Sequence, residues 1–325
     1  MIQPLILLAA LWFVFAAAGQ EPANLAPAPG LVAMTATTIE SGSKEPWRSL
    51  LFLPKRYFQN GAEPLPLLLY LHGSSGRGKD LEVLKRYGPP SRLKNETDFP
   101  MAMLAPQLPG GGWDPGSVLT LLDEVLSTYR IDPDRVYLTG VSLGGQGSWS
   151  VAARAPERFA AFAPVCGYGN LQDASRIGKL PVWAFHGALD DIIPLAPHQA
   201  LIEAVNAAGG SAKLTVYEGG DHGNIIVPIY GRDGGGRLYT WLLTHRRGQP
   251  VVPWPAAEQL ERLPGPGTPA APPAPAPATP TSTSTQEPGA IWDRLFQLLD
   301  GGAKPADAAA SEGAHSGGAV GTPAP

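Results

Sequence analysis

One serine stands between two glycines in the G-x-S-x-G pattern of residues 140–144. The pattern lies between a predicted strand and a predicted helix. Gly140 and Gly144 lack the Cβ atoms that would collide with neighbouring backbone in a turn tight enough to expose Ser142 at the tip of the strand. The dipole of the following helix also favours negative charge at Ser142. The segment therefore predicts a turn that presents a nucleophilic serine, with an ordinary glycine-rich turn as the alternative.

Residues that could activate this serine follow it in the chain. A hydroxyl is a poor nucleophile at neutral pH, so a histidine must take its proton and a carboxylate must orient that histidine. His222 lies on a glycine-flanked loop, and Asp190 and Asp191 directly follow an apolar run. The order serine, aspartate, histidine is the one expected for an α/β-hydrolase. We expect His222 to be the base and Asp190 to orient it, with Asp191 as the alternative acid.

A glycine-rich loop after the apolar run 67–71 is expected to bind the oxyanion of the reaction. The backbone N–H of Leu143 and that of Ser74 are the predicted donors, with Ser75 as a second choice for the loop donor. His72 precedes Ser142 in the chain, which is the wrong order for the base. We expect its ring to brace the loop.

The remaining histidines and the cysteine are expected to have no catalytic role. His186 occupies a turn at the end of a strand and is interpreted as structural. His198 and His245 fall in or near helical patterns, where solvated positions are expected. Cys166 ends an apolar run, and it is expected to be a small buried hydrophobic residue.

Trp113 lies in a loop after the run 101–104. It could form a wall of the substrate pocket, or it could belong to the core or a plain surface loop. The chain has no cluster of His, Asp and Glu with the spacing of a metal site, and no glycine-rich phosphate loop follows its first strand. We therefore predict that no metal and no cofactor is required.

Short apolar runs alternate with helical patterns over residues 47–247. The runs 67–71, 101–104, 136–138, 159–165 and 181–185 are continuously apolar, which is typical of strands buried on both faces. Helices are predicted over about 118–129, with Ser117 as N-cap, and over about 144–154, 194–208 and 233–246. Residues 47–53 are predicted to form a strand that belongs to an antiparallel edge. This alternation predicts a mainly parallel, doubly wound sheet whose site lies at the carboxyl ends of the strands.

The first 19 residues carry no charged side chain, and 5–18 form an apolar run followed by small residues. We interpret residues 1–19 as a cleavable signal peptide, which predicts a secreted or periplasmic protein with no stable membrane span after cleavage. A retained N-terminal anchor is the alternative. Residues 20–46 are expected to form a linker and an edge region before the catalytic domain of residues 47–247.

Residues 248–325 are rich in Pro and Ala and are predicted to form a disordered tail, with a short amphipathic helix at 289–300. The tail could reach a surface or a protein partner. The net charge of the chain is −4, with 24 Lys and Arg against 28 Asp and Glu, and the excess of acid lies in the tail. No clustered excess of basic residues indicates a nucleic-acid partner.

The quoted segments resemble the α/β-hydrolase superfamily over about 47–246. Within it, the chain is similar to exported carboxylesterases of the phospholipase/carboxylesterase, feruloyl esterase and polyhydroxybutyrate depolymerase type, often called prolyl-oligopeptidase-like. The likeness rests on the loop after 67–71, the block 131–145, the segment 163–167, the turn 186–190 and the segment 220–222. The resemblance implies that Asp190, four residues after His186, is the acid.

The sequence therefore predicts an exported serine hydrolase that cleaves small-molecule or polymer esters through an acyl-enzyme. A serine peptidase or amidase with the same three residues is the first alternative, although the 46 residues before Trp47 are too few for a propeller-like domain. A non-catalytic exported binding module with a spacer tail is the second alternative.

Overall fold

The computed structural model describes residues 29–35, 47–231 and 236–265. The predicted signal peptide and the predicted helix at 289–300 lie outside the described residues. The strands are β1 (Gly30–Thr35), β2 (Arg48–Leu53), β3 (Leu65–Leu71), β4 (Ala102–Gln107), β5 (Ile131–Val141), β6 (Ala161–Val165), β7 (Pro181–Gly187), β8 (Ser211–Tyr217) and β9 (Leu260–Leu263). The α-helices are α1 (Gly88–Leu93), α2 (Pro115–Thr128), α3 (Leu143–Arg154), α4 (Ala174–Ile177), α5 (Leu195–Ala207), α6 (Ile226–Tyr230) and α7 (Gly236–Leu243). Short 3-10 helices are η1 (Lys55–Phe58), η2 (Ser74–Gly76), η3 (Leu81–Arg86), η4 (Pro156–Arg158), η5 (Leu171–Asp173) and η6 (Ala256–Glu258).

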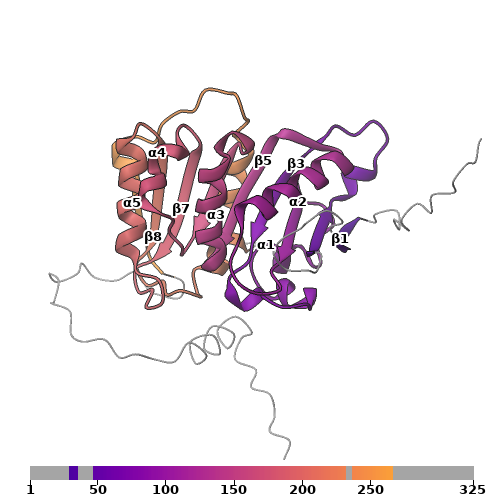
Figure 1. Ribbon diagram of the computed structural model, residues 1–325, viewed down its shortest axis with the longest axis horizontal. Helices are drawn as coiled ribbons and strands as arrows, with labels where there is room; N and C mark the ends of the chain where they lie inside the picture. The colour runs from indigo at the N-terminus through magenta and orange to yellow at the C-terminus, as the bar shows by residue number, and fades with distance from the viewer. Residues whose placement is uncertain (1–28, 36–46, 232–235, 266–325) are drawn as a thin grey trace, which may run out of the picture.

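The nine strands form one sheet in the order β1-β2-β4-β3-β5-β6-β7-β8-β9. β1 pairs with β2 and β2 pairs with β4 in antiparallel fashion, and the other pairs are parallel. Figure 1 shows the strands side by side behind the long helices. The sheet is therefore mainly parallel, as the alternation of apolar runs and helical patterns predicts, and the carboxyl ends of β3 to β9 lie at one edge of it.

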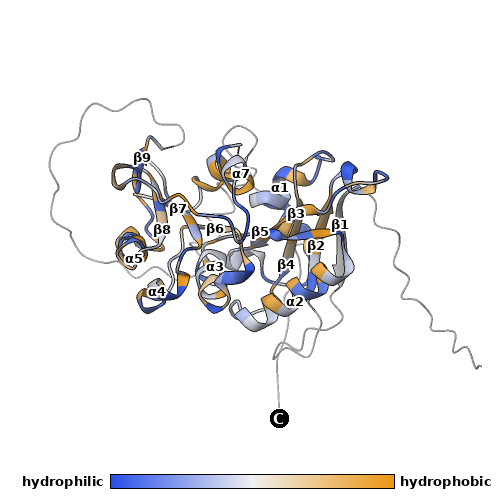
Figure 2. Ribbon diagram, turned by 90° about the horizontal axis from the view of Figure 1, so that it is seen from above, coloured by the Kyte–Doolittle hydropathy of each residue, from blue (hydrophilic) through white to orange (hydrophobic). Residues whose placement is uncertain are grey.

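Helices cover both faces of the sheet. Figure 2, which looks along the layers, shows α2, α3, α4 and α5 on one side of the strands and α1 and α7 on the other. A hydrophobic cluster lies on each side, and β3 contributes to both because all seven of its residues are buried. The central strands are continuously apolar because each of their faces meets helices.

One detail of the predicted elements is corrected. Asp114, not Ser117, is the N-cap of α2: its carboxylate accepts the backbone N–H of Ser117 at 2.7 Å. The missed signal is Pro115. Proline favours the first position of a helix, so the N-cap is the residue before it, Asp114. The strand predicted at 47–53 is β2, which pairs in antiparallel fashion with β1 and β4 at this edge of the sheet, and β1, the outermost strand, lies in the predicted edge region 20–46.

The sheet extends past the boundary predicted at Gly248. Residues 260–263 form β9, which pairs in parallel with β8 from Leu214↔Leu260 to Tyr217↔Leu263. Residues 260–263 of the predicted tail are therefore part of the sheet. Among the residues that the structure describes, no helix is both long enough and apolar enough to cross a lipid bilayer.

Candidate active site

Ser142 lies between the end of β5 and the start of α3 in a strained turn. Its backbone has φ 56° and ψ −118°, a region that side-chain-bearing residues rarely adopt. A Cβ on Gly140 would collide with the carbonyl of Gly144, and one on Gly144 would collide with the carbonyl of Leu71. The two glycines thus allow β5, α3 and the end of β3 to approach closely enough to form this turn.

The structure brings Ser142, His222 and Asp190 together from three different strand ends. His222 follows β8 and Asp190 follows β7. The Oγ atom of Ser142 is 2.9 Å from Nε2 of His222, and Nδ1 of His222 is 2.7 Å from Oδ2 of Asp190. Ser142 is 4% and His222 is 2% exposed. The residues are connected in the order in which a proton would pass from the hydroxyl to the imidazole.

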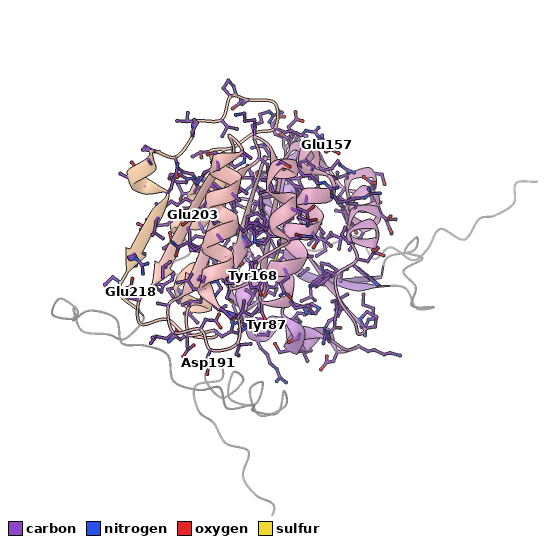
Figure 3. All side chains as sticks on the ribbon, turned by 60° about the vertical axis from the view of Figure 1, so that its left-hand side comes forward. Tyr87, Glu157, Tyr168, Asp191, Glu203 and Glu218 are labelled. Carbon is purple, nitrogen blue, oxygen red and sulfur yellow. The ribbon has the colours of Figure 1, made fainter. Side chains whose placement is uncertain are left out.

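Asp190, rather than Asp191, lies against His222. The Asp190 side chain is fully buried, and its Oδ1 accepts the backbone N–H groups of Ile192 at 3.0 Å and Ile193 at 2.8 Å. Burial by itself raises the pKa of Asp190, but hydrogen bonds from His186 and His222 outweigh it and hold that pKa well below its usual range. Asp191, which is labelled in Figure 3, lies on the same turn and is exposed. Asp190 is therefore an ionised acceptor for the Nδ1–H of His222.

The electrostatic surroundings of His222 favour its charged form. Burial lowers the pKa of the imidazole, whereas Cys166 and the hydrogen bond and charge of Asp190 raise it, and the net direction is upward. Because Asp190 accepts at Nδ1, neutral His222 has its lone pair at Nε2, directed at Ser142. His222 can thus accept a proton there and is stabilised once it has done so.

Two backbone N–H groups begin helices beside Ser142. Leu143 is the first residue of α3, whose first intrahelical bond runs from Gln146 N to Ser142 O at 2.9 Å. Ser74 is the first residue of η2, and the preceding Gly73 is so close that a Cβ on it would lie 3.4 Å from Cβ of Ser142. The first N–H groups of a helix have no partner within it. The predicted oxyanion donors Leu143 and Ser74 are therefore the first residues of two helices that begin beside the serine.

The buried ring of His72 connects the loop that contains Ser74 to the segment after β4. Its Nδ1 donates to Gly73 O at 2.5 Å, and its Nε2 accepts the backbone N–H of Leu108 at 3.0 Å. Burial lowers the pKa of His72 to about 4, so the ring is neutral at physiological pH. Both nitrogens are engaged by backbone, in agreement with the interpretation of His72 as a brace.

Trp113 does not form an exposed pocket wall. Its side chain is 7% exposed and belongs to the core cluster under α2 and α3, where it meets the ring of Trp47 edge-on at 5.7 Å between centroids. Its Nε1 donates to the carbonyl of His72 at 3.1 Å. Trp113 is thus a core residue, which is one of the alternatives. Through His72 it also contacts the loop that contains Ser74.

His198 is buried, which contradicts the expected solvated position. It is 0% exposed in α5, and its Nδ1 is 2.9 Å from Nδ1 of His186. The Nε2 of His186 is 2.9 Å from the carbonyl of Ile193 and 3.3 Å from Oδ2 of Asp190. The sequence interpretation of His186 as structural did not include its contact with the acid. A histidine in the first turn of a helix directly after the Asp190 turn is the signal that could have indicated this pair.

Cys166 lies at the end of β6 next to the histidine and the acid. Among the described residues, Cys166, Asp190 and His222 are the one group of three whose potential metal-ligand atoms all lie within 4.8 Å of one another. Oδ2 of Asp190 and Nδ1 of His222 already hydrogen-bond to each other, and Sγ of Cys166 lies 3.6 Å from the carbonyl of His222. The atoms that could bind a metal therefore already contact one another or neighbouring backbone within the site.

Residues 116–225 match the Dienelactone hydrolase family. A 77-residue stretch is 35% identical to the bifunctional acetylxylan esterase/xylanase XynS20E of Neocallimastix patriciarum and covers 23% of this chain. NocK of Nocardia uniformis subsp. tsuyamanensis, which is named an esterase, is 27% identical over 225 residues and 58% of this chain. The crystal structure of a thermostable esterase superposes with a TM-score of 0.55 at 26% identity over 67% of this chain.

An acylaminoacyl peptidase of Pyrococcus horikoshii shares the fold, with a TM-score of 0.52 at 14% identity over 70% of this chain and 43% of its own. The chain spans 11% of XynS20E, 63% of NocK and 64% of the thermostable esterase, less than two thirds of each. The sheet order, the strained serine turn and these similarities agree on one fold. The chain has the α/β-hydrolase fold, and its residues 116–225 match the dienelactone hydrolase family of that superfamily.

Proposed function

We propose that this protein is an exported serine hydrolase that cleaves carboxylic esters through an acyl-enzyme. The observation that carries the proposal is the continuous hydrogen-bonded chain from Ser142 through His222 to Asp190, with heavy-atom distances of 2.9 and 2.7 Å. These distances are within the range in which a base activates a nucleophile. The similarity to proteins named as esterases supports the same reaction class.

In the first half-reaction, Nε2 of His222 takes the proton of Ser142 as Oγ attacks the ester carbonyl carbon. The carbonyl π electrons move to oxygen, and the N–H groups of Leu143 and Ser74 donate to the resulting oxyanion. The tetrahedral intermediate collapses, the bond to the alcohol oxygen breaks, and that oxygen receives the proton from Nε2. Asp190 stabilises the imidazolium throughout, because its carboxylate faces Nδ1.

In the second half-reaction, a water molecule takes the place of the alcohol. His222 accepts one proton from the water as its oxygen attacks the acyl carbon, and the same two N–H groups bind the new oxyanion. Collapse breaks the bond between the acyl carbon and Oγ, and the proton on Nε2 returns to Ser142. The products are the carboxylic acid and the restored enzyme, and no metal or cofactor takes part in either step.

The substrate that we propose is a small-molecule or polymer ester outside the cytoplasm. One relative is named an acetylxylan esterase, whose substrate is an ester on a polymer. The apolar run at 5–18 supports export, and the proposal includes delivery to the periplasm or the medium. The tail beyond the sheet is proposed to act as a spacer to a surface or protein partner.

The decisive experiment is labelling of the purified full chain with a fluorophosphonate probe, alongside Ser142→Ala. The probe reports an activated serine without knowledge of the substrate. We expect labelling of the native chain, none of the variant, and a loss of turnover of up to ~10⁶-fold on any ester that is cleaved. A folded native chain that takes no label would contradict the proposal and favour a non-catalytic binding module.

Matched ester and anilide substrates with the same acyl group distinguish an esterase from a peptidase. Cleavage of an amide requires His222 to protonate the departing nitrogen, which is a poorer leaving group than the alcohol oxygen of an ester. Ester cleavage therefore depends less on this proton transfer. We expect ester turnover to exceed anilide turnover by at least ~100-fold. Comparable rates would favour the amidase alternative.

A further inference from the structure

Two buried histidines lie beyond Asp190, on the side away from Ser142. His186 is in β7, at its carboxyl end, and His198 is in the first turn of α5; both are 0% exposed. Their Nδ1 atoms are 2.9 Å apart, and Nε2 of His186 is 3.3 Å from the Oδ2 of Asp190 that also receives His222. The proposed reaction as described above uses neither ring.

The Asp190 carboxylate is surrounded by donors. Oδ1 accepts the N–H groups of Ile192 and Ile193, and Oδ2 has two imidazoles against it: Nδ1 of His222 at 2.7 Å and Nε2 of His186 at 3.3 Å. A buried carboxylate stays ionised and fixed in orientation when its lone pairs are all used in this way. His186 therefore supplies one of the interactions that determine how basic Asp190 is toward His222.

The contacts of His186 assign its tautomer. Its Nε2 faces two oxygen acceptors, the Ile193 carbonyl at 2.9 Å and Asp190, so Nε2 must carry a hydrogen. Neutral His186 then has a lone pair at Nδ1, which requires a donor. His198 Nδ1 is in position to be that donor.

The same reasoning assigns His198. With its hydrogen on Nδ1, neutral His198 has only a lone pair at Nε2, and this buried atom has no hydrogen-bond partner among the described residues. With the hydrogen of His198 on Nε2 instead, that buried N–H would have no acceptor. His186 would then have to donate from Nδ1 as well as from Nε2, which would give its ring a positive charge. Burial and the neighbouring His186 lower the pKa of His198 well below its usual value, which agrees with a neutral ring.

We propose that His186 and His198 are positioning residues of the site: the Nδ1–H of His198 fixes the orientation of the His186 ring, whose Nε2–H lies against the Asp190 carboxylate and helps to hold it toward His222. This inference rests on the proposed serine-hydrolase function. The titratable groups that face the cluster are Cys166 from the end of β6, His222 from the loop after β8 and His198 from α5, while Asp191 is exposed.

The consequence is a shift in the protonation of His222. When the donor on His198 is lost, Nδ1 of His186 has no partner to hold the ring in its orientation, and the Nε2–H turns toward the Ile193 carbonyl and away from Asp190. Asp190 then has one donor fewer. Its negative charge is less compensated by other groups, so the carboxylate stabilises the His222 imidazolium more strongly. The pKa of His222 rises, and the acid limb of kcat/KM moves to higher pH.

The test compares His198→Phe with His198→Asn in the full chain. Phe keeps a ring beside Trp149, whose centroid is 6.0 Å from that of His198, but has no N–H. The Asn amide nitrogen is attached at the same distance from Cβ as Nδ1 and keeps a donor. We expect His198→Phe to raise the His222 midpoint, followed by ¹⁵N NMR and by kcat/KM, by about one pH unit. His198→Asn should stay close to the native midpoint.

His245→Phe is the matched control, because Nδ1 of His245 bonds to the Trp241 carbonyl and the Thr244 hydroxyl of its own helix end. It should leave the His222 midpoint unchanged. Equal midpoints in all variants, or the same shift with Phe and with Asn, would overturn the inference. A shift with His245→Phe as large as that with His198→Phe would do the same.

The NMR readout needs no substrate, so it separates this inference from the proposed function. Native ¹⁵N couplings must show His186 protonated at Nε2 alone and His198 at Nδ1 alone. If His198→Phe does not fold, these couplings and the His198→Asn midpoint decide the matter. An inactive chain with the expected tautomers would overturn only the proposed function, whereas a native His186 protonated at Nδ1 would overturn the inference.

Discussion

The thiol of Cys166 lies 3.6 Å from the backbone carbonyl of His222, so the end of β6 contacts the same residue whose ring faces Ser142. Cys166 has a positive φ of 37° and is 0% exposed. A non-glycine residue in this conformation is uncommon and is often found where surrounding contacts over-determine it. The strand end therefore supports the backbone of the His222 loop from within the sheet.

Replacement of Cys166 by Ala should lower turnover only modestly, by about 2- to 10-fold, because a thiol is a weak hydrogen-bond donor. The variant should still take the fluorophosphonate label, since Ser142 and not the thiol is the proposed nucleophile. Stopped-flow labelling rates of the two proteins measure the change. Complete loss of labelling in a folded Cys166→Ala protein would show that the cysteine takes part in the chemistry.

Asp190 and its neighbour Asp191 give a second, internally controlled prediction. Asp190→Asn should lower kcat by about 10⁴-fold, since an amide in place of the carboxylate removes the charge that stabilises imidazolium and favours the wrong tautomer of His222. Asp191→Asn should leave kcat within about two-fold, because that side chain is exposed. The measurement is ester turnover of both variants at one pH. A crippling Asp191→Asn beside a mild Asp190→Asn would reverse the assignment of the acid.

The pH dependence follows from the raised pKa of His222. His222 must be neutral to accept a proton, so kcat/KM should fall as the pH drops through that pKa, and the acid limb should lie above the usual value of 6.5. Asp190→Asn removes the negative charge and should move the His222 midpoint down by about one to three pH units. NMR titration of His222 follows both proteins. An acid limb below pH 6 in the native enzyme would contradict this account.

Much of the site was accessible from the sequence because its signals are local. The glycines around Ser142 and the position of Asp190 just beyond an apolar run each depend on a few neighbouring residues. The continuous apolar strands likewise report burial on both faces, which is why the parallel sheet could be predicted. Ser142 and Asp190 each closely follow a strand, so their positions in the fold can be inferred from the neighbouring sequence.

The contacts that the sequence did not reveal depend on tertiary packing. His198 falls in an amphipathic helical pattern, and only the packing of α5 on the sheet shows that its ring meets His186. β9 lies in a Pro- and Ala-rich stretch whose composition indicates a tail, yet its backbone pairs with β8. Its side chains alternate between exposed and half-buried, so the apolar signal of a buried strand is missing. Backbone pairing of this kind leaves little trace in composition.

The amino end of β5 gives a prediction about stability. Asp132 accepts hydrogen bonds from Arg135 Nε and from Arg246 Nη1, both at 2.7 Å. Burial by itself raises the pKa of Asp132, but these hydrogen bonds outweigh it and lower that pKa. Asp132→Asn should reduce the free energy of unfolding by about 1 kcal/mol at pH 7, at the low end for charged hydrogen bonds because the two arginine side chains are 32% and 40% exposed and screened by solvent.

The sign of the pH effect is set by the lowered pKa of Asp132. Its stabilisation is present above the unfolded value of about 3.9 and is lost as the pH falls through the folded pKa, so the difference between native and variant protein should vanish in strong acid. Urea unfolding at pH 7 and at a series of decreasing pH values below the unfolded pKa measures this. Asp123→Asn is the control, because Asp123 pairs with Arg158 through a side chain that is 60% exposed and should change stability little. Equal losses in the two variants would mean that the Asp132 pairs stabilise the fold no more than an exposed ion pair does.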